Sequence, residues 1–313
     1  MKAAVISEIG SAPVVAEFRD PSPAAGVQVG HLLAASLNPV DLVIAAGKMP
    51  HRPVAPPFVA GFEGVAQLGS GQVIYLAGPP QPFGTLAELI PVPDDHAIPV
   101  PDGLDPVLAS SLGVAGLAAW LSLDYRGDLR PGESVLILGA GTVGLIAVQA
   151  ARAMGAERVV IADVRAKALQ TATRKGADAA INLTGLDTAA MREAFRSAAP
   201  QGFDLVLDLV WGDAVNAAID AAKVHARIVQ TGNAASPTVQ LPAAVFRNKH
   251  ISIIGQSIFV APIEVRRTAY TALAQAALDG AISLDTTSAR LDEVGVAWRR
   301  LTEGAPEKQI VVP

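Results

Sequence analysis

Hydrophobic positions recur in two different ways along the chain, and the change comes near Gly113. Beyond that residue, apolar runs typical of buried parallel strands alternate with segments whose apolar residues have helical spacing. The strand-like runs are residues 134–138, 158–162, 179–182, 204–208, 227–231 and 251–254, and the helical segments are 143–154, 165–175 and 214–222. Such alternation predicts an α/β fold built on a doubly wound parallel sheet.

The first hundred residues follow the other pattern. Short apolar runs at 27–36, 64–68, 73–76 and 86–92 are cut by Pro and Gly, which predicts an irregular β-rich domain. The last apolar run, at 310–312, has no sheet of its own to join, so we expect it to fold back onto this first domain. The predicted organisation is a discontinuous β-rich domain of residues 1–113 and 261–313, with the parallel-sheet domain, residues 114–260, inserted in it.

Composition and charge exclude several classes of function. Hydrophobic residues make up 51% of the 313 residues and charged residues 17%, which predicts a folded core and not disorder. A net charge of -5 makes nucleic acid a poor partner, and the absence of Cys removes disulfides, thiolate metal ligands and cysteine nucleophiles. Residues 106–123 and 134–151 carry no charge but are interrupted by Gly and Ser, so we interpret them as buried core and expect no membrane span.

A glycine-rich loop follows the first predicted parallel strand and opens a helix. Its residues are Gly139, Ala140, Gly141, Thr142, Val143 and Gly144. In a G-x-G-x-x-G loop the first glycine permits a tight turn, the second lets a pyrophosphate approach the backbone, and the third lets the helix pack closely on the strand. The helix N-terminus then offers amide donors to the phosphates. This context favours dinucleotide binding in a Rossmann-like domain over an ordinary glycine-rich turn.

An acidic residue follows the loop at the spacing expected for a ribose ligand. Asp163 lies nineteen residues beyond Gly144, at the end of the next strand, and would repel a 2′-phosphate, which favours NAD(H) over NADP(H). Arg165 and Lys167 follow closely and could instead reach a phosphate, which keeps NADP(H) open; Asp163 could also simply cap the next helix. Thr231 and Gly232 follow a later strand, and we expect them in the same crevice.

Four further motifs accompany the glycine loop: Asn-Pro-Val-Asp at 38–41, Gly-Phe-Glu-Gly at 61–64, Phe-Gly-Thr-Leu-Ala-Glu at 83–88 and Lys-Gln-Ile-Val-Val-Pro at 308–313. With them the chain resembles the medium-chain dehydrogenase/reductase superfamily over nearly its whole length. The resemblance implies a GroES-like catalytic domain that carries an inserted Rossmann-like cofactor domain. It also implies a small-molecule substrate that meets the nicotinamide between the two domains.

The chain departs from the zinc-dependent members of that family at the metal ligands. Those enzymes have Cys where this chain has Asn38 and His where it has Phe62, and the five His here lack ligand spacing. Without a Lewis acid, hydride transfer is confined to activated acceptors. The resemblance therefore points to the zinc-independent, quinone-oxidoreductase-like branch. It implies a metal-independent NAD(P)H-dependent enzyme that reduces a quinone or the activated C=C or C=O bond of a small carbonyl compound.

Two residues of the first motif are catalytic candidates. Asn38 stands where the family places a residue beside the nicotinamide, and its amide could stabilise negative charge that develops on a carbonyl oxygen. Its other interpretation is a turn residue before Pro39. Asp41 could orient a group or relay a proton, but it could also be the N-cap of a helix over 42–46 that ends at Gly47, and we favour that structural role.

The source of the substrate proton is less well marked. The quinone-reductase pattern usually has Arg where this chain has Ala45 and Tyr where it has Met49. His51 and Arg52 follow on a loop, and either could replace the missing donor, although exposed loop charges explain both. We interpret Glu63 as a residue that hydrogen-bonds within its glycine-flanked turn.

Three expectations complete the picture. A protein of this fold that binds the dinucleotide but has lost catalysis, as a redox sensor or structural protein, is the alternative to an enzyme. The start of the sequence lacks a secretory signal, so we expect a cytoplasmic location. The apolar strand 251–254 should lie at a sheet edge and pair with a second copy, so we expect a homodimer, which light scattering after size exclusion would test.

Overall fold

The computed structural model describes residues 1–49 and 52–313, which form two compact units. Unit 1 comprises Met1–Ala115, Tyr270–Asp279 and Ser283–Pro313, and unit 2 comprises Gly116–Ala269 and Gly280–Ile282. Unit 2 is therefore an insertion in a discontinuous unit 1. Residues 261–269, which the sequence pattern assigns to the return segment, pack with unit 2.

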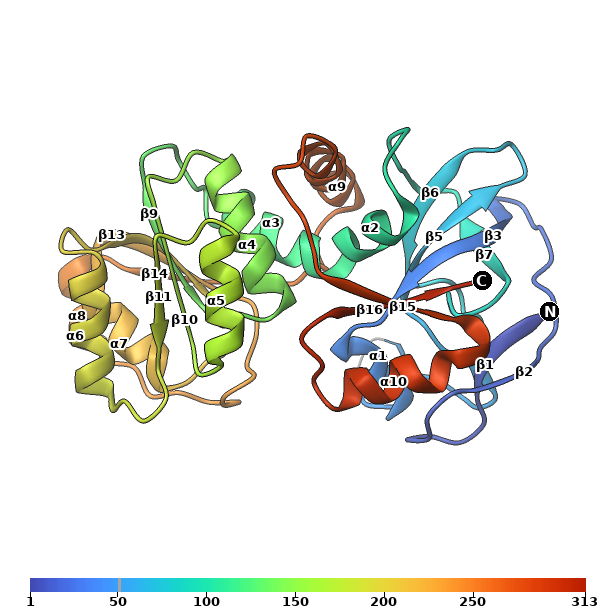
Figure 1. Ribbon diagram of the computed structural model, residues 1–313, viewed down its shortest axis with the longest axis horizontal. Helices are drawn as coiled ribbons and strands as arrows, with labels where there is room; N and C mark the ends of the chain where they lie inside the picture. The colour runs from blue at the N-terminus through green and yellow to red at the C-terminus, as the bar shows by residue number, and fades with distance from the viewer. Residues whose placement is uncertain (50–51) are drawn as a thin grey trace. The chain divides into compact units, whose positions relative to one another are not determined.

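Unit 2 is built on a six-stranded parallel sheet in the order β11-β10-β9-β12-β13-β14 (Figure 1). Its strands are β9 (Ser134–Leu138), β10 (Arg158–Asp163), β11 (Ala179–Asn182), β12 (Phe203–Asp208), β13 (Ala222–Gln230) and β14 (Ser252–Gly255). Its helices are α3 (Leu117–Leu123), α4 (Thr142–Ala153), α5 (Ala166–Arg174), α6 (Thr188–Ala198), α7 (Asp213–Ala221) and α8 (Ala243–Lys249). The predicted α/β class and parallel sheet are confirmed, and β14 lies at the sheet edge as predicted; pairing with a second copy stays a prediction.

One strand of unit 2 is longer than the pattern predicts. β13 begins at Ala222 and not at Arg227, because its first residues pair with β12 before a register shift between Phe203 and Leu205. Residues of this early part, such as Val224 and His225, are exposed, so they give no signal of a buried strand.

Unit 1 contains a three-stranded sheet, β2-β1-β4, and a seven-stranded sheet, β15-β16-β3-β5-β6-β8, in which β7 also pairs with β3. The strands are β1 (Lys2–Ile6), β2 (Val14–Glu17), β3 (Val27–Ser36), β4 (Phe58–Val59), β5 (Glu63–Leu68), β6 (Val73–Ala77), β7 (Leu89–Pro93), β8 (Ile98–Pro99), β15 (Thr286–Arg290) and β16 (Lys308–Val312). Its helices are α1 (Pro39–Ala45), α2 (Pro106–Ser111) and α10 (Val294–Thr302). α9 (Ile263–Leu278) has residues in both units.

The last strand decides how unit 1 closes. β16 pairs antiparallel with β3 through Ile310 and Ser36 and parallel with β15, so it lies inside the larger sheet. Its side chains Ile310 and Val311 are fully buried. The predicted return of the final apolar run onto the first domain is confirmed. This return places Lys308 next to Asn38 and Glu63.

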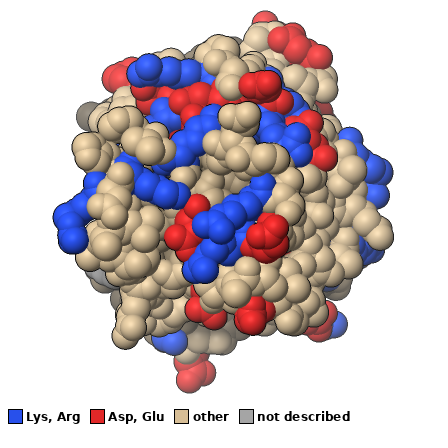
Figure 2. Space-filling view, turned by 90° about the vertical axis from the view of Figure 1, so that its left-hand side faces the viewer, with Lys and Arg blue, Asp and Glu red and all other residues tan. Residues whose placement is uncertain are grey.

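The two uncharged stretches are mostly core. Pro106–Leu123 is long and apolar enough to cross a membrane, and 72% of this window is buried inside the protein. Residues 134–151 divide into β9, which is buried throughout, and most of α4. On the face drawn in Figure 2, Lys and Arg side chains stand among Asp and Glu side chains, without one sign covering it. That no nucleic acid binds stays a prediction.

Candidate functional site

The glycine loop of unit 2 has the geometry of a phosphate-binding turn. Gly139 has a φ of +108°, a backbone conformation that favours glycine, and its N–H donates to the Ala162 carbonyl at 2.8 Å. A Cβ on Gly144 would lie 1.9 Å from the Gly139 carbonyl oxygen, so the third glycine lets α4 pack against the loop itself. A Cβ on Gly141 would meet no atom closer than 3.8 Å, which leaves room over the N-terminus of α4.

The other predicted cofactor residues of unit 2 lie at the same edge of its sheet. Thr231 and Gly232 follow β13, and their N–H groups donate to the Asp208 carbonyl at the end of β12. A Cβ on Gly139 would lie 3.3 Å from the Cβ of Leu209, which follows β12. The loops after β9, β12 and β13 therefore meet at the carboxyl edge, where doubly wound sheets bind their ligands.

Asp163 is held by a neighbouring arginine. Its Oδ1 accepts from the backbone N–H (2.8 Å) and Nε (3.0 Å) of Arg165, and its Oδ2 accepts from Arg165 Nη2 (2.8 Å) and the Ala140 N–H (2.6 Å). Burial acts to raise the pKa of Asp163, but the Arg165 and Ala140 hydrogen bonds prevail and lower it. These four contacts use about all the acceptor positions of a carboxylate, which leaves none for ribose hydroxyls while Arg165 stays in place. Lys167 is exposed on α5.

Asp208 is a feature that the sequence analysis missed. Its carboxylate is fully buried at the carboxyl edge, where Oδ1 accepts from the N–H groups of Val210 (3.0 Å) and Trp211 (2.9 Å). Its Oδ2 has no hydrogen-bond partner among residues 1–49 and 52–313, and burial raises its pKa. The available signal was an Asp that directly follows the buried apolar residues Leu205–Leu207. This unpaired acceptor beside the loops fits a site that awaits a ligand.

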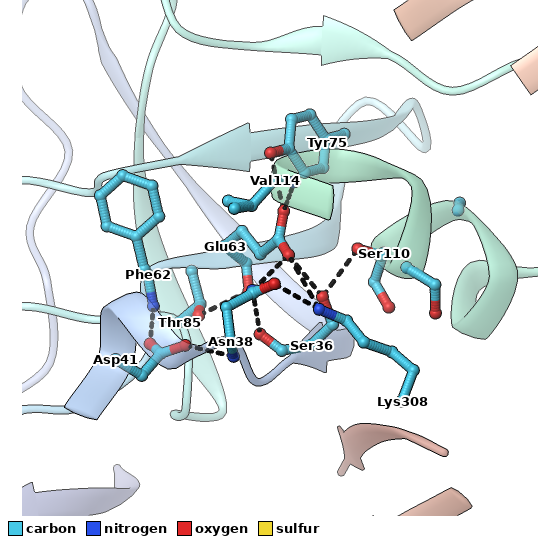
Figure 3. A network of polar contacts seen from close by, with 12 residues as sticks. Ser36, Asn38, Asp41, Phe62, Glu63, Tyr75, Thr85, Ser110, Val114 and Lys308 are labelled. Carbon is cyan, nitrogen blue, oxygen red and sulfur yellow. Dashed lines mark hydrogen bonds and ion pairs between the residues drawn. The ribbon is translucent and has the colours of Figure 1, made fainter. Parts of the chain in front are cut away.

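In unit 1, Glu63 is the centre of a buried network of polar contacts (Figure 3). Its Oε1 accepts from Ser36 Oγ and Asn38 Nδ2, both at 2.6 Å. Its Oε2 accepts from Tyr75 Oη (2.9 Å) and the Val114 N–H (2.5 Å). The interpretation of Glu63 as a residue bonded within its own turn is therefore wrong, because Glu63 is the first residue of β5 and its carboxylate binds residues of three other segments, 36–38, 75 and 114.

A buried lysine completes this network. Lys308 Nζ lies 3.8 Å from Glu63 Oε1 and donates to Asn38 Oδ1, while a Cβ on Gly113 would lie 1.9 Å from Glu63 Oε2. Burial lowers the pKa of Lys308, although Glu63 and Asp41 act against that shift. The pair is thus a buried ion pair whose carboxylate is fully hydrogen-bonded, the arrangement that offsets the cost of desolvation.

The amide of Asn38 is occupied by this network. Its Nδ2 donates to Glu63 and, at 3.4 Å, to the Ser36 carbonyl, and its Oδ1 accepts from Lys308. A donor held by a carboxylate at 2.6 Å is poorly placed to bind a substrate oxygen as well. The geometry weighs against Asn38 as the predicted oxyanion donor and favours a role in positioning.

Asp41 is not the N-cap of its helix. Asn38 is the N-cap residue of α1, with Pro39 in its first turn, and Asp41 is the third helical residue. The Asp41 carboxylate reaches back to the Asn38 N–H (2.7 Å) and also accepts from the Phe62 N–H (2.8 Å). The predicted helix over 42–46 accordingly begins earlier, at Pro39.

The two loop candidates have different outcomes. His51 lies outside the residues that the structure describes. The Arg52 guanidinium lies 5.6 Å from the centre of the Phe62 ring, and its Nη2 donates to the Pro79 carbonyl at 2.5 Å. Burial lowers its pKa, while Asp41 acts to raise it. Arg52 is therefore a partly buried cation near Asp41.

Comparison with known proteins identifies this architecture. Residues 142–276 match the family model for zinc-binding dehydrogenase. A quinone oxidoreductase of Thermus thermophilus, whose structure is known with NADPH, is 28% identical, with all of both chains covered and a TM-score of 0.81. A mycobacterial quinone oxidoreductase is 22% identical, also over all of both chains, with a TM-score of 0.90. These matches are consistent with a quinone-oxidoreductase-like member of the medium-chain dehydrogenase/reductase superfamily. The fold of the chain is that of the superfamily's quinone oxidoreductases.

A curated relative matches over a shorter stretch. The L-threonine 3-dehydrogenase of Chromobacterium violaceum is 36% identical over 126 residues, which is 40% of this chain and 36% of that protein. The chain thus covers about a third of the length of that relative. The activity of that relative is accordingly no guide to the activity of this chain.

The residues of this chain at the family's zinc-ligand positions do not fit a catalytic zinc ion. Asn38 is engaged by Glu63 and Lys308, and Phe62 has no donor atom. Within the part of the chain that the structure describes, no three His, Asp or Glu side chains are grouped closely enough to hold a metal.

Unit 2 also has a groove that lies away from the carboxyl edge of its sheet. Its volume is about 540 Å³, and it is lined by the end of α6, the loop 199–202 and the end of α7. That loop leads into β12, so the groove is at the amino edge of the parallel sheet, opposite the glycine loop. Its position separates it from the predicted dinucleotide site.

Proposed function

We propose that this chain is a metal-independent, NADPH-dependent oxidoreductase that reduces a quinone or an activated C=C or C=O bond of a small carbonyl compound. The observation that carries the proposal is the combination of a complete phosphate loop in unit 2 with the absence of zinc ligands at Asn38 and Phe62. The bound dinucleotide supplies a hydride. The chain's own residues then have to hold the phosphates and provide a proton.

The preference for NADPH rests on Arg165. The sequence-based preference for NAD, drawn from Asp163, is not supported, because Arg165 neutralises that carboxylate and occupies its acceptor positions. The Arg165 side chain is 53% exposed, and its Nη2 lies 3.8 Å from where a Cβ of Gly141 would be. A guanidinium placed beside the loop can bind a 2′-phosphate in bidentate fashion. The NADPH complex of the Thermus thermophilus relative supports this choice.

The activity is tested with the full chain and both dinucleotides. We expect NADPH to be oxidised when a quinone or an enone is added, with no loss of rate in EDTA. A rate abolished by EDTA and restored by zinc would contradict metal independence. Nucleotide binding without turnover across the acceptor panel would favour the second candidate function, a dinucleotide-binding redox sensor or structural protein, to which the engaged amide of Asn38 lends weight.

Replacing Arg165 with Gln should weaken NADPH binding and spare NADH. Loss of the charge-assisted contacts to a 2′-phosphate, at about 1.5–3 kcal/mol, raises the Kd for NADPH about 10- to 100-fold. Calorimetric titration with each nucleotide measures this, and Arg174→Gln in the last turn of α5 is the matched control, an exposed arginine expected to change either Kd less than about threefold. Equal loss of both nucleotides in Arg165→Gln would show that Arg165 has only a structural role. A homodimer and a cytoplasmic location stay predictions.

A further inference from the structure

Asp41 is a buried carboxyl group with no ion-pair partner among residues 1–49 and 52–313. It is 3% exposed, and its two oxygens accept the Asn38 and Phe62 N–H groups. In the described part of the chain, no ion pair joins it to Lys, Arg or His. By contrast, Glu63 nearby has Lys308 within 3.8 Å. Burying a carboxylate without a counter-ion costs free energy, and this cost favours the protonated form of Asp41.

Some groups around Asp41 raise its pKa and others lower it. Burial raises its pKa to about 7, and the negative charge of Glu63 adds to the rise, whereas the Asn38 and Phe62 hydrogen bonds and the positive charge of Lys308 oppose it. Arg52, on the loop beside Phe62, is the other charged group that Asp41 faces. The carboxyl group is therefore close to half-protonated at neutral pH.

A small cavity of unit 1 borders this carboxyl group. It is lined by Asp41, Arg52 and Gln81 together with the apolar side chains of Ile6, Ile44, Ala45, Phe58 and Val59 and residues 60–61, and its volume is about 10 Å³. That is about the space of one water molecule, and the polar groups on its wall are enough to bind one. Besides its two backbone donors, Asp41 therefore borders a cavity whose wall also carries the polar side chains of Arg52 and Gln81.

We propose that Asp41 is the internal acid of unit 1, which passes its proton by way of this cavity to the anion that hydride addition leaves on the substrate. This rests on the proposed function. The substrate gains a hydride at one carbon and the Asp41 proton at the neighbouring carbon or oxygen, while the Asp41 O–H bond breaks and leaves a carboxylate. A solvent proton that enters through the cavity restores the acid.

The protonation of Asp41 can be measured without any cofactor. In the full chain labelled with ¹³C at Asp side-chain carboxyls, we expect one resonance to titrate near pH 7, to vanish in Asp41→Asn and to remain in the exposed control Asp95→Asn. Arg52→Gln keeps the carboxyl group and removes a positive charge, so the same resonance should then titrate at higher pH. A resonance assigned to Asp41 that titrates below about pH 5 would overturn the proposal.

The transfer of that proton is measured with two acceptors. In Asp41→Asn, kcat for an enone should fall about 100-fold and lose the decline above about pH 7 that the wild type shows, because the acid form is required. A quinone should be affected far less, since oxygen anions take protons rapidly from water. A wild-type pH profile in active Asp41→Asn overturns the donor role alone. An inactive wild type whose Asp41 titrates near 7 overturns the donor role and the proposed function together.

Discussion

Replacing Lys308 with Met is expected to lower the free energy of unfolding by about 3–5 kcal/mol. The substitution leaves Glu63, which is fully buried, with a charge that no cation balances, although its four hydrogen bonds remain. It also removes the donor to Asn38 Oδ1. Equilibrium urea unfolding followed by circular dichroism measures the loss.

Two controls separate the buried charge from the lost side chain. The double variant Lys308→Met with Glu63→Gln removes both charges, so it should be more stable than Lys308→Met alone. Lys2→Met removes the partner of Asp292 from an ion pair whose side chains are 46% and 53% exposed, and it should cost less than about 1 kcal/mol. If Lys308→Met were as mild as Lys2→Met, the ion pair with Glu63 would not be the element that stabilises unit 1.

The stability of the wild type should fall, relative to Asp41→Asn, as the pH rises from about 4 to about 7. In the unfolded chain Asp41 loses its proton near its ordinary pKa of 3.8, whereas in the folded chain burial raises the pKa to about 7. Between these values the unfolded state binds fewer protons than the folded state, so the contribution of Asp41 is complete below pH 3.8 and is lost by about pH 7. The difference between the two pKa values corresponds to at most about 4 kcal/mol.

The comparison has to be made as a difference between variants. Asp163 and Asp178 have lowered pKa values, so their contributions are lost as the pH falls and act against that of Asp41. Urea midpoints of wild type and Asp41→Asn at each pH from about 4 to about 8 cancel those shared contributions. Parallel curves for the two proteins would show that Asp41 ionises as an ordinary carboxyl group in the folded state.

Local patterns in the sequence predicted unit 2 well. β9 and β11 begin and end at the predicted residues. β9 is buried throughout, and β11 is an edge strand that is mostly half-buried, but each is a short apolar run bounded by turn residues. The glycine loop was found for the same reason, since its chemistry is contained in six consecutive positions. The glycine-loop sequence does not show that the Arg165 side chain turns towards Asp163. For this reason the spacing of Asp163 alone favoured NAD.

Local sequence patterns could not predict the polar network around Glu63 in unit 1. Glu63 and Lys308 meet only because β16 joins the sheet of β3 and β5, and no local periodicity relates residues so distant in the chain. For Asp41 a usable signal was present. Both Asn38 and Asp41 are good N-cap residues, but Pro39 is favoured in the first turn of a helix, which selects Asn38 as the cap.

The position of β16 inside the larger sheet has a consequence for synthesis on the ribosome. All of the strands of unit 2 have emerged before β16 is translated, so that unit can fold while the chain is still growing. Until β16 is made, the end of β3 at Ala35 and Ser36 lacks this partner strand, although β7 already pairs with the beginning of β3. During this interval the nascent chain presents an unpaired strand edge, which chaperones can bind and which favours aggregation.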